Sequence, residues 1–231
     1  MNNRLAFGNN YASISTDANF LATQLSKIVP SLEYLESANN KNKFLGKNYN
    51  VNINKLKISA SYMSSTKVYA KSSAEYTLMI PIKGNCITTV ENNNFSWGEN
   101  SFAYCKPRCE GKSITSQEKN IVLFDISPEK FNQQIKIMLG EEFKNNIYNF
   151  ENPNLIALNY YGISFSFMFK QICKIIDYNI NYIETLEKTK FDELIYRTFV
   201  MMFLPKYFFN DTICVRKIKD STSTIKLIKE L

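Results

Sequence analysis

From Val51 to Ile126 the chain alternates apolar and polar positions in short runs separated by Gly, Pro, Asn or Ser. A period of two is typical of β-strands, in which successive side chains point to opposite faces. The residues that share a face are Leu56, Ile58, Ala60 and Tyr62 in one run, and Tyr76, Leu78, Ile80 and Ile82 in the next. This pattern predicts a sheet built from short strands.

The segment TLMIPIKGNCITTV, residues 77–90, predicts a hairpin that turns at Lys83-Gly84-Asn85. Pro81 cannot donate a hydrogen bond to a strand ladder, so we expect it at a sheet edge or at a bulge. Further strands are predicted at residues 101–105 and 121–126, each bounded by turn-forming residues. Short antiparallel strands at regular intervals favour a small barrel or sandwich over a parallel sheet.

Two short helices flank the predicted strands. Residues 17–29 place Phe20, Leu21, Leu25 and Ile28 at helical spacing, and the helix is expected to stop at Pro30. Residues 128–140 follow Ser-Pro, repeat apolar positions every four residues, and end on a glycine. An α+β fold is therefore expected, with one helix before the strands and another after them.

Two longer runs near the C-terminus, residues 155–183 and 189–204, carry broad apolar stripes at helical spacing. Because a short polar turn joins them, they predict an antiparallel helix pair. The stripes would pack on the barrel, or they would form a surface for self-association, since the pair has more apolar area than a single small sheet covers. The residues that we expect at a homodimer interface are Phe165, Phe169, Ile172 and Ile176.

The composition excludes several kinds of chemistry. The 231 residues include no histidine, which removes Ser-His-Asp and Cys-His catalysis and the usual histidine-based iron and zinc sites. The seven glycines form neither a dinucleotide-binding nor a P-loop motif. The five cysteines are scattered, and zinc bound at CKPRC would need two distant ligands. We therefore predict a protein that is not an enzyme and has no metal and no cofactor.

Charge and hydropathy bear on partners and location. The net charge of +7 invites a nucleic-acid interpretation. Lys, Asn and Ile all have AT-rich codons, however, so genome composition also accounts for the lysine excess. The longest apolar run, residues 199–204, is far shorter than the roughly 20 residues that span a bilayer, and the first residues lack the apolar core of a signal peptide. The sequence predicts a cytoplasmic protein with no membrane contact.

The order of these elements resembles the AraC/XylS family of bacterial transcription regulators, in particular those with an AraC-binding-like sensor. The resemblance is carried by EYTLMIPIKGNCITTV followed by FSWGENSFAYCKP, by NIVLFDISPEKF, and by FDELIYRTFVMMFL. It covers roughly residues 12–230. The final segment STSTIKLIKEL is similar to the opening of the family's first DNA-binding helix.

The resemblance implies a cupin-like antiparallel β-barrel or sandwich, flanked by an N-terminal helix and followed by an antiparallel helix pair. It implies three parts: a sensor domain at 1–150, a helical dimerisation hairpin at 151–210, and a linker with the stub of a DNA-binding domain at 211–231. Because a lone initial helix cannot place a recognition helix in a groove, contact with DNA is expected only through a C-terminal helix-turn-helix domain that this sequence lacks.

The resemblance also implies a small-molecule effector inside the barrel. The contacts expected from inward strand positions are Tyr62, Tyr76, Leu78, Ile80 and Tyr104, with Arg108 as an anchor for an acidic ligand. The alternatives are an effector-independent dimerisation module that sequesters a full-length regulator, a metal-free cupin enzyme, and direct nucleic-acid binding by the basic surface. The sequence does not distinguish an activator from a repressor.

Overall fold

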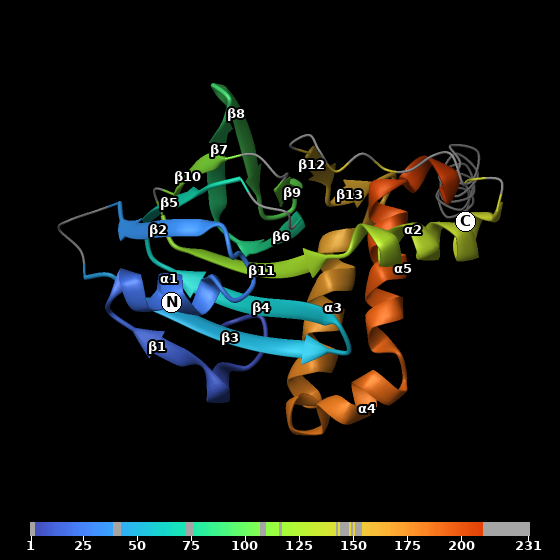
Figure 1. Ribbon diagram of the computed structural model, residues 1–231, viewed down its shortest axis with the longest axis horizontal. Coiled ribbons are helices and arrows are strands. Elements are labelled where there is room, and N and C mark those ends of the chain that lie inside the picture. The colour runs from blue at the N-terminus through green and yellow to red at the C-terminus, as the bar shows by residue number, and fades with distance from the viewer. Residues whose placement is uncertain are drawn as a thin grey trace, which may run out of the picture.

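The computed structural model describes residues 3–38, 43–72, 76–106, 110–115, 117–141, 143, 148, 150 and 154–209. It is a cupin-like antiparallel half-barrel whose outer face carries a group of helices (Figure 1). The predicted α+β fold class, with an entry helix and a C-terminal helix pair, is confirmed.

The helices are α1 (Ala18–Leu25), α2 (Pro128–Leu139), α3 (Phe165–Tyr178), α4 (Ile183–Lys188) and α5 (Phe191–Phe203), with short 3-10 turns at Asn9–Tyr11, Ile180–Tyr182 and Pro205–Tyr207. The strands of the large sheet are β1 (Ser13–Ser15), β2 (Leu32–Ser37), β3 (Gly46–Ile53), β4 (Leu56–Met63), β5 (Thr66–Ala70), β6 (Tyr76–Lys83), β7 (Asn85–Val90), β8 (Asn93–Gly98), β9 (Phe102–Lys106), β10 (Gly111–Thr115), β11 (Lys119–Ile126) and β12 (Asn154–Ala157). A separate small ribbon pairs β13 (Asn159–Tyr160) with β14 (Ile163–Ser164).

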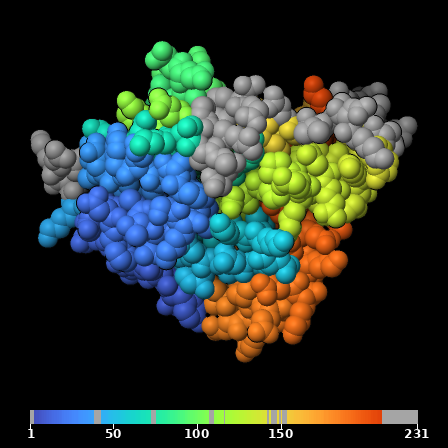
Figure 2. Space-filling view, in the orientation of Figure 1, coloured from blue at the N-terminus to red at the C-terminus, as the bar shows by residue number. Residues whose placement is uncertain are grey.

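The large sheet folds into two walls. The first wall has the strand order β1-β3-β4-β11-β6-β9, and β12 extends it beyond β9. The second wall has the order β8-β7-β10-β5-β2. The walls are joined where Gly98 of β8 pairs with Phe102 of β9. On the opposite side α1 packs against both β2 and β3, so the N-terminal residues cover the flank of the barrel (Figure 2).

The predicted hairpin at residues 77–90 does not form a ladder. β6 pairs with β11 and β9, whereas β7 pairs with β8 and β10, so the two consecutive strands belong to different walls. Gly84 makes the bend between them with a positive φ of 87°, and its carbonyl accepts a hydrogen bond from the backbone N–H of Glu99. The turn was predicted correctly, but the partners of both strands come from segments distant in the sequence.

Pro81 lies at an irregularity of the β6–β11 ladder, as predicted. The register shifts between Asn120, which is opposite Lys83, and Ile121, which is opposite Pro81. β6 is an interior strand, so a proline that donates no hydrogen bond is accommodated by the bulge rather than by an edge.

Polar caps fix where three of the helices begin. The side chains of Asp17, Ser127 and Ser164 accept hydrogen bonds from backbone N–H groups in the first turns of α1, α2 and α3 respectively. The helix predicted over 155–183 is correct only for Phe165–Tyr178, after which a 3-10 turn at Ile180–Tyr182 leads into α4. The ten residues before Phe165 form β12, β13 and β14, because Leu155 and Ile156 extend the first wall beside β9.

The antiparallel helices α3 and α5 lie side by side against the outer face of the first wall (Figure 1). Phe124 of β11 contacts Phe169 of α3 and Phe199 of α5, with ring centroids 5.8 and 5.1 Å apart, and the last two rings stack at 5.8 Å. Strands and helices therefore share one apolar core. Among the residues that the structure describes, no helix is long and apolar enough to cross a membrane.

The first wall is covered on both faces. Along β11, Val122, Phe124 and Ile126 belong to the core under the helices, whereas Ile121 and Leu123 belong to a second core inside the barrel. The strand β12, from the predicted hairpin part at 151–210, pairs with β9 of the predicted sensor part at 1–150. The division into parts stays a prediction, and the part at 211–231 lies outside the described residues.

Candidate functional site: the barrel cavity

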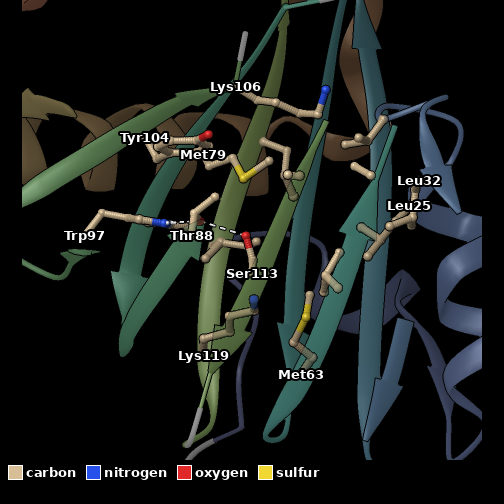
Figure 3. A pocket seen from close by; sticks show the side chains of 16 residues that line it. Leu25, Leu32, Met63, Met79, Thr88, Trp97, Tyr104, Lys106, Ser113 and Lys119 are labelled. Atoms are coloured by element: carbon tan, nitrogen blue, oxygen red, sulfur yellow. Dashed lines mark hydrogen bonds between the residues drawn. The ribbon is translucent and has the colours of Figure 1, made fainter. Parts of the chain in front are cut away.

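A small cavity lies inside the half-barrel, between its two walls and α1. Its volume is about 60 Å³. Sixteen side chains line it, and they come from α1 and the loop that follows it, from β4, β6, β9 and β11 of the first wall, and from strands of the second wall (Figure 3). Most of this lining is aliphatic or aromatic, as expected for a ligand site.

An aromatic pair and a chain of hydrogen bonds form one side of the cavity. The rings of Trp97 and Tyr104 stack with centroids 5.9 Å apart. Trp97 Nε1 donates to Thr88 Oγ1 at 2.9 Å, and Thr88 Oγ1 lies 2.7 Å from Ser113 Oγ. These bonds, drawn as dashed lines in Figure 3, link β8, β7 and β10 and hold the indole against the cavity.

Two lysines also line the cavity, and both are buried. Lys106 and Lys119 are 5% and 4% exposed. Lys106 Nζ donates to the backbone carbonyl of Lys71 at 3.2 Å. Lys119 Nζ donates to the sulfur of Cys86 at 3.3 Å, and that sulfur lies 3.3 Å from Thr115 Oγ1. Buried ammonium groups are rare unless they are paired with an anion, so this is the most unusual electrostatic feature of the barrel.

The lining limits what the cavity could hold. Within the described ranges, no three His, Cys, Asp or Glu side chains lie close enough together to hold a metal ion. A cavity of about 60 Å³ accommodates a few water molecules or a very small organic molecule. Ligand pockets more often measure roughly 300–1,000 Å³.

No family model matches the sequence, and no curated protein matches it. The solved structures do include similar chains. One is the AraC-like transcriptional activator CuxR, which is 6% identical and aligns over 81% of this chain and 69% of that chain with a TM-score of 0.54. The fold of this protein resembles that of CuxR. Because residues up to the end of β12 make up less than 81% of the chain, the likeness to CuxR includes part of the C-terminal helices.

Two cupin structures match a smaller part of the chain. A cupin-2 domain containing protein from Shewanella frigidimarina is 14% identical over 33% of this chain and 76% of that chain, with a TM-score of 0.30. A cupin superfamily protein from Desulfitobacterium hafniense is 12% identical over 39% of this chain and 82% of that chain, with a TM-score of 0.31.

Of the residues expected to contact an effector, Tyr104 lines the cavity of this CuxR-like fold. Tyr62, Tyr76, Leu78 and Ile80 belong instead to the core between the first wall and the helices. The period-two pattern grouped them correctly on one face, but that face points away from the barrel interior. Their neighbours Met63 and Met79 line the cavity. Arg108 lies outside the described residues.

Tyr62 has a different polar partner. Its hydroxyl donates to Glu118 Oε2 at 2.7 Å, and Glu118 also pairs with Lys83. Burial and the hydrogen bond to Glu118 raise the pKa of Tyr62. The pKa of Glu118 is lowered, chiefly by its hydrogen bonds from Lys83 and Tyr62. This cluster joins β4, β6 and the start of β11 on the helix side of the wall.

The residues expected at a dimer interface are buried within the single chain. Phe165, Phe169 and Ile176 are fully buried and Ile172 is 5% exposed, because this face of α3 packs on the first wall and on α5. They hold the helix to the sheet and present no surface to a partner. The exposed apolar residues of α3 lie on its other face: Phe167, Ile175 and Tyr178.

Sequence reasoning did not single out Trp97, Lys106 or Lys119. Lys119 alternates with Ile121 and Leu123 along β11, so a charged residue beside two apolar ones on the same face was visible in KNIVLFDI. Both faces of that strand are apolar, however, and the sequence alone does not tell which of them lines a cavity.

Proposed function

We propose that this protein is the effector-sensing and dimerisation part of an AraC-type transcription regulator. The observation that carries the proposal is the likeness to CuxR, an AraC-like transcriptional activator, over a region that includes both the barrel and part of the helices. A barrel with an internal cavity supports sensing. In this proposal the protein is not an enzyme, and contact with DNA belongs to a C-terminal helix-turn-helix domain.

The first wall offers a route from the cavity to the helices. Leu123 lines the cavity, and its neighbour Phe124 contacts Phe169 and Phe199 on the opposite face of β11. A ligand that favours one position of this strand therefore favours one arrangement of α3 and α5. Its effect is a population shift, limited by the difference between its affinities for the two arrangements.

Dimerisation is proposed to use the outward face of α3. Phe167 and Tyr178 are 61% and 84% exposed, and Ile175 between them is 39% exposed. Large apolar side chains gathered on one helix face of a single chain mark a protein interaction surface. A two-fold arrangement would bring the same face of a second copy against it.

The proposal is tested with the chain fused to a DNA-binding domain that represses a reporter only as a dimer. We expect repression by the fusion and a dimer mass in sedimentation equilibrium. We also expect the repression to change when a cavity ligand is added. A monomer at micromolar concentration, together with no repression, would refute the dimerisation part of the proposal.

An effector-independent dimerisation module is the second candidate, and the cavity volume favours it. About 60 Å³ is small beside common ligand pockets. This candidate also predicts a dimer, but no small molecule would change its melting temperature or the repression by the fusion. Ligand response therefore separates the two candidates.

A further inference from the structure

The buried ammonium group of Lys119 has a weak internal partner. Its Nζ carries three donor hydrogens, and within the described part of the chain its one polar contact is the Cys86 sulfur at 3.3 Å. Thiol sulfur is a poor acceptor. The neighbouring carboxylate, Glu118, is bound to Lys83 and to the Tyr62 hydroxyl instead. A charge that is 4% exposed in an apolar barrel is costly unless an anion pairs with it.

Buried hydroxyl groups without hydrogen-bond partners lie on the inward faces of the nearby strands. Thr66 Oγ1 and Ser61 Oγ are buried and have no hydrogen-bond partner among the residues that the structure describes. Thr66 is two residues from Val68, and Ser61 is two residues from Met63, and both of these neighbours line the cavity. Thr66 is also opposite Thr115, whose hydroxyl contacts the Cys86 sulfur. These two hydroxyls lie next to lining residues in the sequence, but Thr66 and Ser61 do not themselves line the cavity.

The rest of the lining is suited to a short hydrocarbon chain. Lys119 extends into the cavity from one end in Figure 3, and Lys106 lies toward the other. The lining also includes Met79, Leu123 and the Trp97–Tyr104 stack. A volume of about 60 Å³ leaves room for a body of about two to four carbon atoms.

We propose that the barrel binds a short-chain monocarboxylate whose anionic head pairs with Lys119 and whose hydrocarbon body packs between Leu123 and Trp97. This inference rests on the proposed sensing function and specifies its ligand class. The ammonium group selects the charged head, and the cavity volume excludes long chains.

The test uses the fluorescence of Trp97, the one tryptophan of the chain. The full chain is titrated with acetate, propionate and butyrate, and in parallel with propionamide and butyramide, at constant ionic strength held with chloride. We expect saturable changes with at least one carboxylate. The matching amide should bind at least tenfold more weakly, because it lacks the charge that Lys119 selects.

The deciding variant is Lys119→Met, which keeps the length of the side chain and removes its charge. We expect it to lower carboxylate affinity at least tenfold. The matched control is Lys55→Met, which removes the same charge from an exposed position in the turn between β3 and β4 and should leave the affinity unchanged. Equal carboxylate affinity in Lys119→Met and the parent chain would overturn the proposal.

A second measurement keeps the proposal testable if the Lys119→Met variant does not fold. In the parent chain, the carboxylates should raise the melting temperature in a concentration-dependent way and the amides should not. Equal shifts from both series would overturn the charge selection while leaving the proposed sensing function intact. No shift and no fluorescence change from either series would overturn this inference, whereas sedimentation and the reporter fusion decide dimerisation separately.

Discussion

Lys130 Nζ lies 2.8 Å from Asp192 Oδ2, and this ion pair ties the first turn of α2 to the first turn of α5. Asn54 Nδ2, in the turn between β3 and β4, donates to the other carboxylate oxygen at 2.7 Å. The carboxylate is buried, so one side chain joins the sheet to both helices.

The Asp192 junction predicts a pH-dependent loss of stability. Burial opposes the charge of Asp192, but hydrogen bonds from Lys130 and Asn54 outweigh it, so the pKa is lowered. A lowered folded-state pKa adds stability that is complete above the unfolded value of about 3.9 and is lost as pH falls through the folded value. Asp192→Asn should cost about 1–3 kcal/mol at pH 7. Urea unfolding at pH 7, 5, 4 and 3 measures the cost.

The comparison of Asp192→Asn with the parent chain isolates this carboxylate from the others. The difference in unfolding free energy should be constant from pH 7 to about pH 5 and then shrink below about pH 4. A difference that stays the same down to pH 3 would show that the Asp192 charge does not stabilise the fold.

The two faces of α3 predict opposite responses to truncation. Phe169→Ala removes a fully buried ring that packs on Phe124 and Phe199, and should cost about 3–5 kcal/mol. Phe167→Ala, at a residue that is 61% exposed, should change the stability of the monomer by about 0.5 kcal/mol or less. Chemical denaturation at low protein concentration measures both. Similar costs would mean that the assigned helix face is wrong.

The same exposed face predicts how to make a monomer. Phe167→Glu and Tyr178→Glu together should leave the far-UV circular dichroism spectrum unchanged, because both side chains are exposed. A charge at the centre of an apolar interface is strongly unfavourable, so the dimer should weaken at least tenfold in sedimentation equilibrium. The control is Lys188→Glu, on the exposed surface of α4. A variant dimer as tight as the parent dimer would place the interface elsewhere.

The bend at Gly84 predicts a folding defect. A Cβ at this position would lie 2.5 Å from the backbone oxygen of Glu118, and φ is 87°. Gly162 has a similar φ of 83° with no atom within 4 Å of the added Cβ, so it is a matched control. Gly162→Ala should cost about 1–2 kcal/mol from backbone strain alone. Gly84→Ala should lower the free energy of unfolding by more than this, because the clash adds to the backbone strain. Equal melting temperatures for the two variants would argue against the clash.

The buried thiols predict protection from alkylation. Burial raises the pKa of the Cys105 and Cys173 thiols to about 12. At pH 8 almost none of either thiol is ionised, and neither is accessible. In a Cys109→Ser/Cys214→Ser variant, iodoacetamide should label Cys105 and Cys173 only when the protein unfolds globally. The labelling should therefore become faster in urea. Fast labelling in native buffer, detected by peptide mass, would contradict this packing.

Much of the fold could be predicted from the sequence because local signals were clear. The spacing in PEKFNQQIKIML gave α2, and Ser127 before Pro128 marked its start. Alternation gave β4, β6 and β11, and Pro81 indicated the bulge. The short strands β2, β5 and β10 were missed because none of them carries a continuous apolar face. In β10, for example, the central residue Ser113 is polar and half-buried, and its apolar neighbour Ile114 is exposed.

The candidate site was much less predictable. Tyr104 was correctly expected inside the barrel, whereas Leu78 and Ile80 face the helices. Alternation sorts a strand's residues into two sets but does not say which set lines the cavity. When both sets are apolar, as along β6, hydrophobicity cannot distinguish them.

By itself, the sequence determined which residues form strands and helices, where Gly84 and Pro81 interrupt them, and which side chains share a face. Only the tertiary structure decided that the consecutive strands β6 and β7 belong to different walls and that Lys119 points into the barrel. The physical reason is that period and turn propensity are local properties of the chain. The partner of a strand and the side of a sheet that encloses a cavity depend on segments far away in the sequence, including α1 and α3, which cover opposite sides of the first wall.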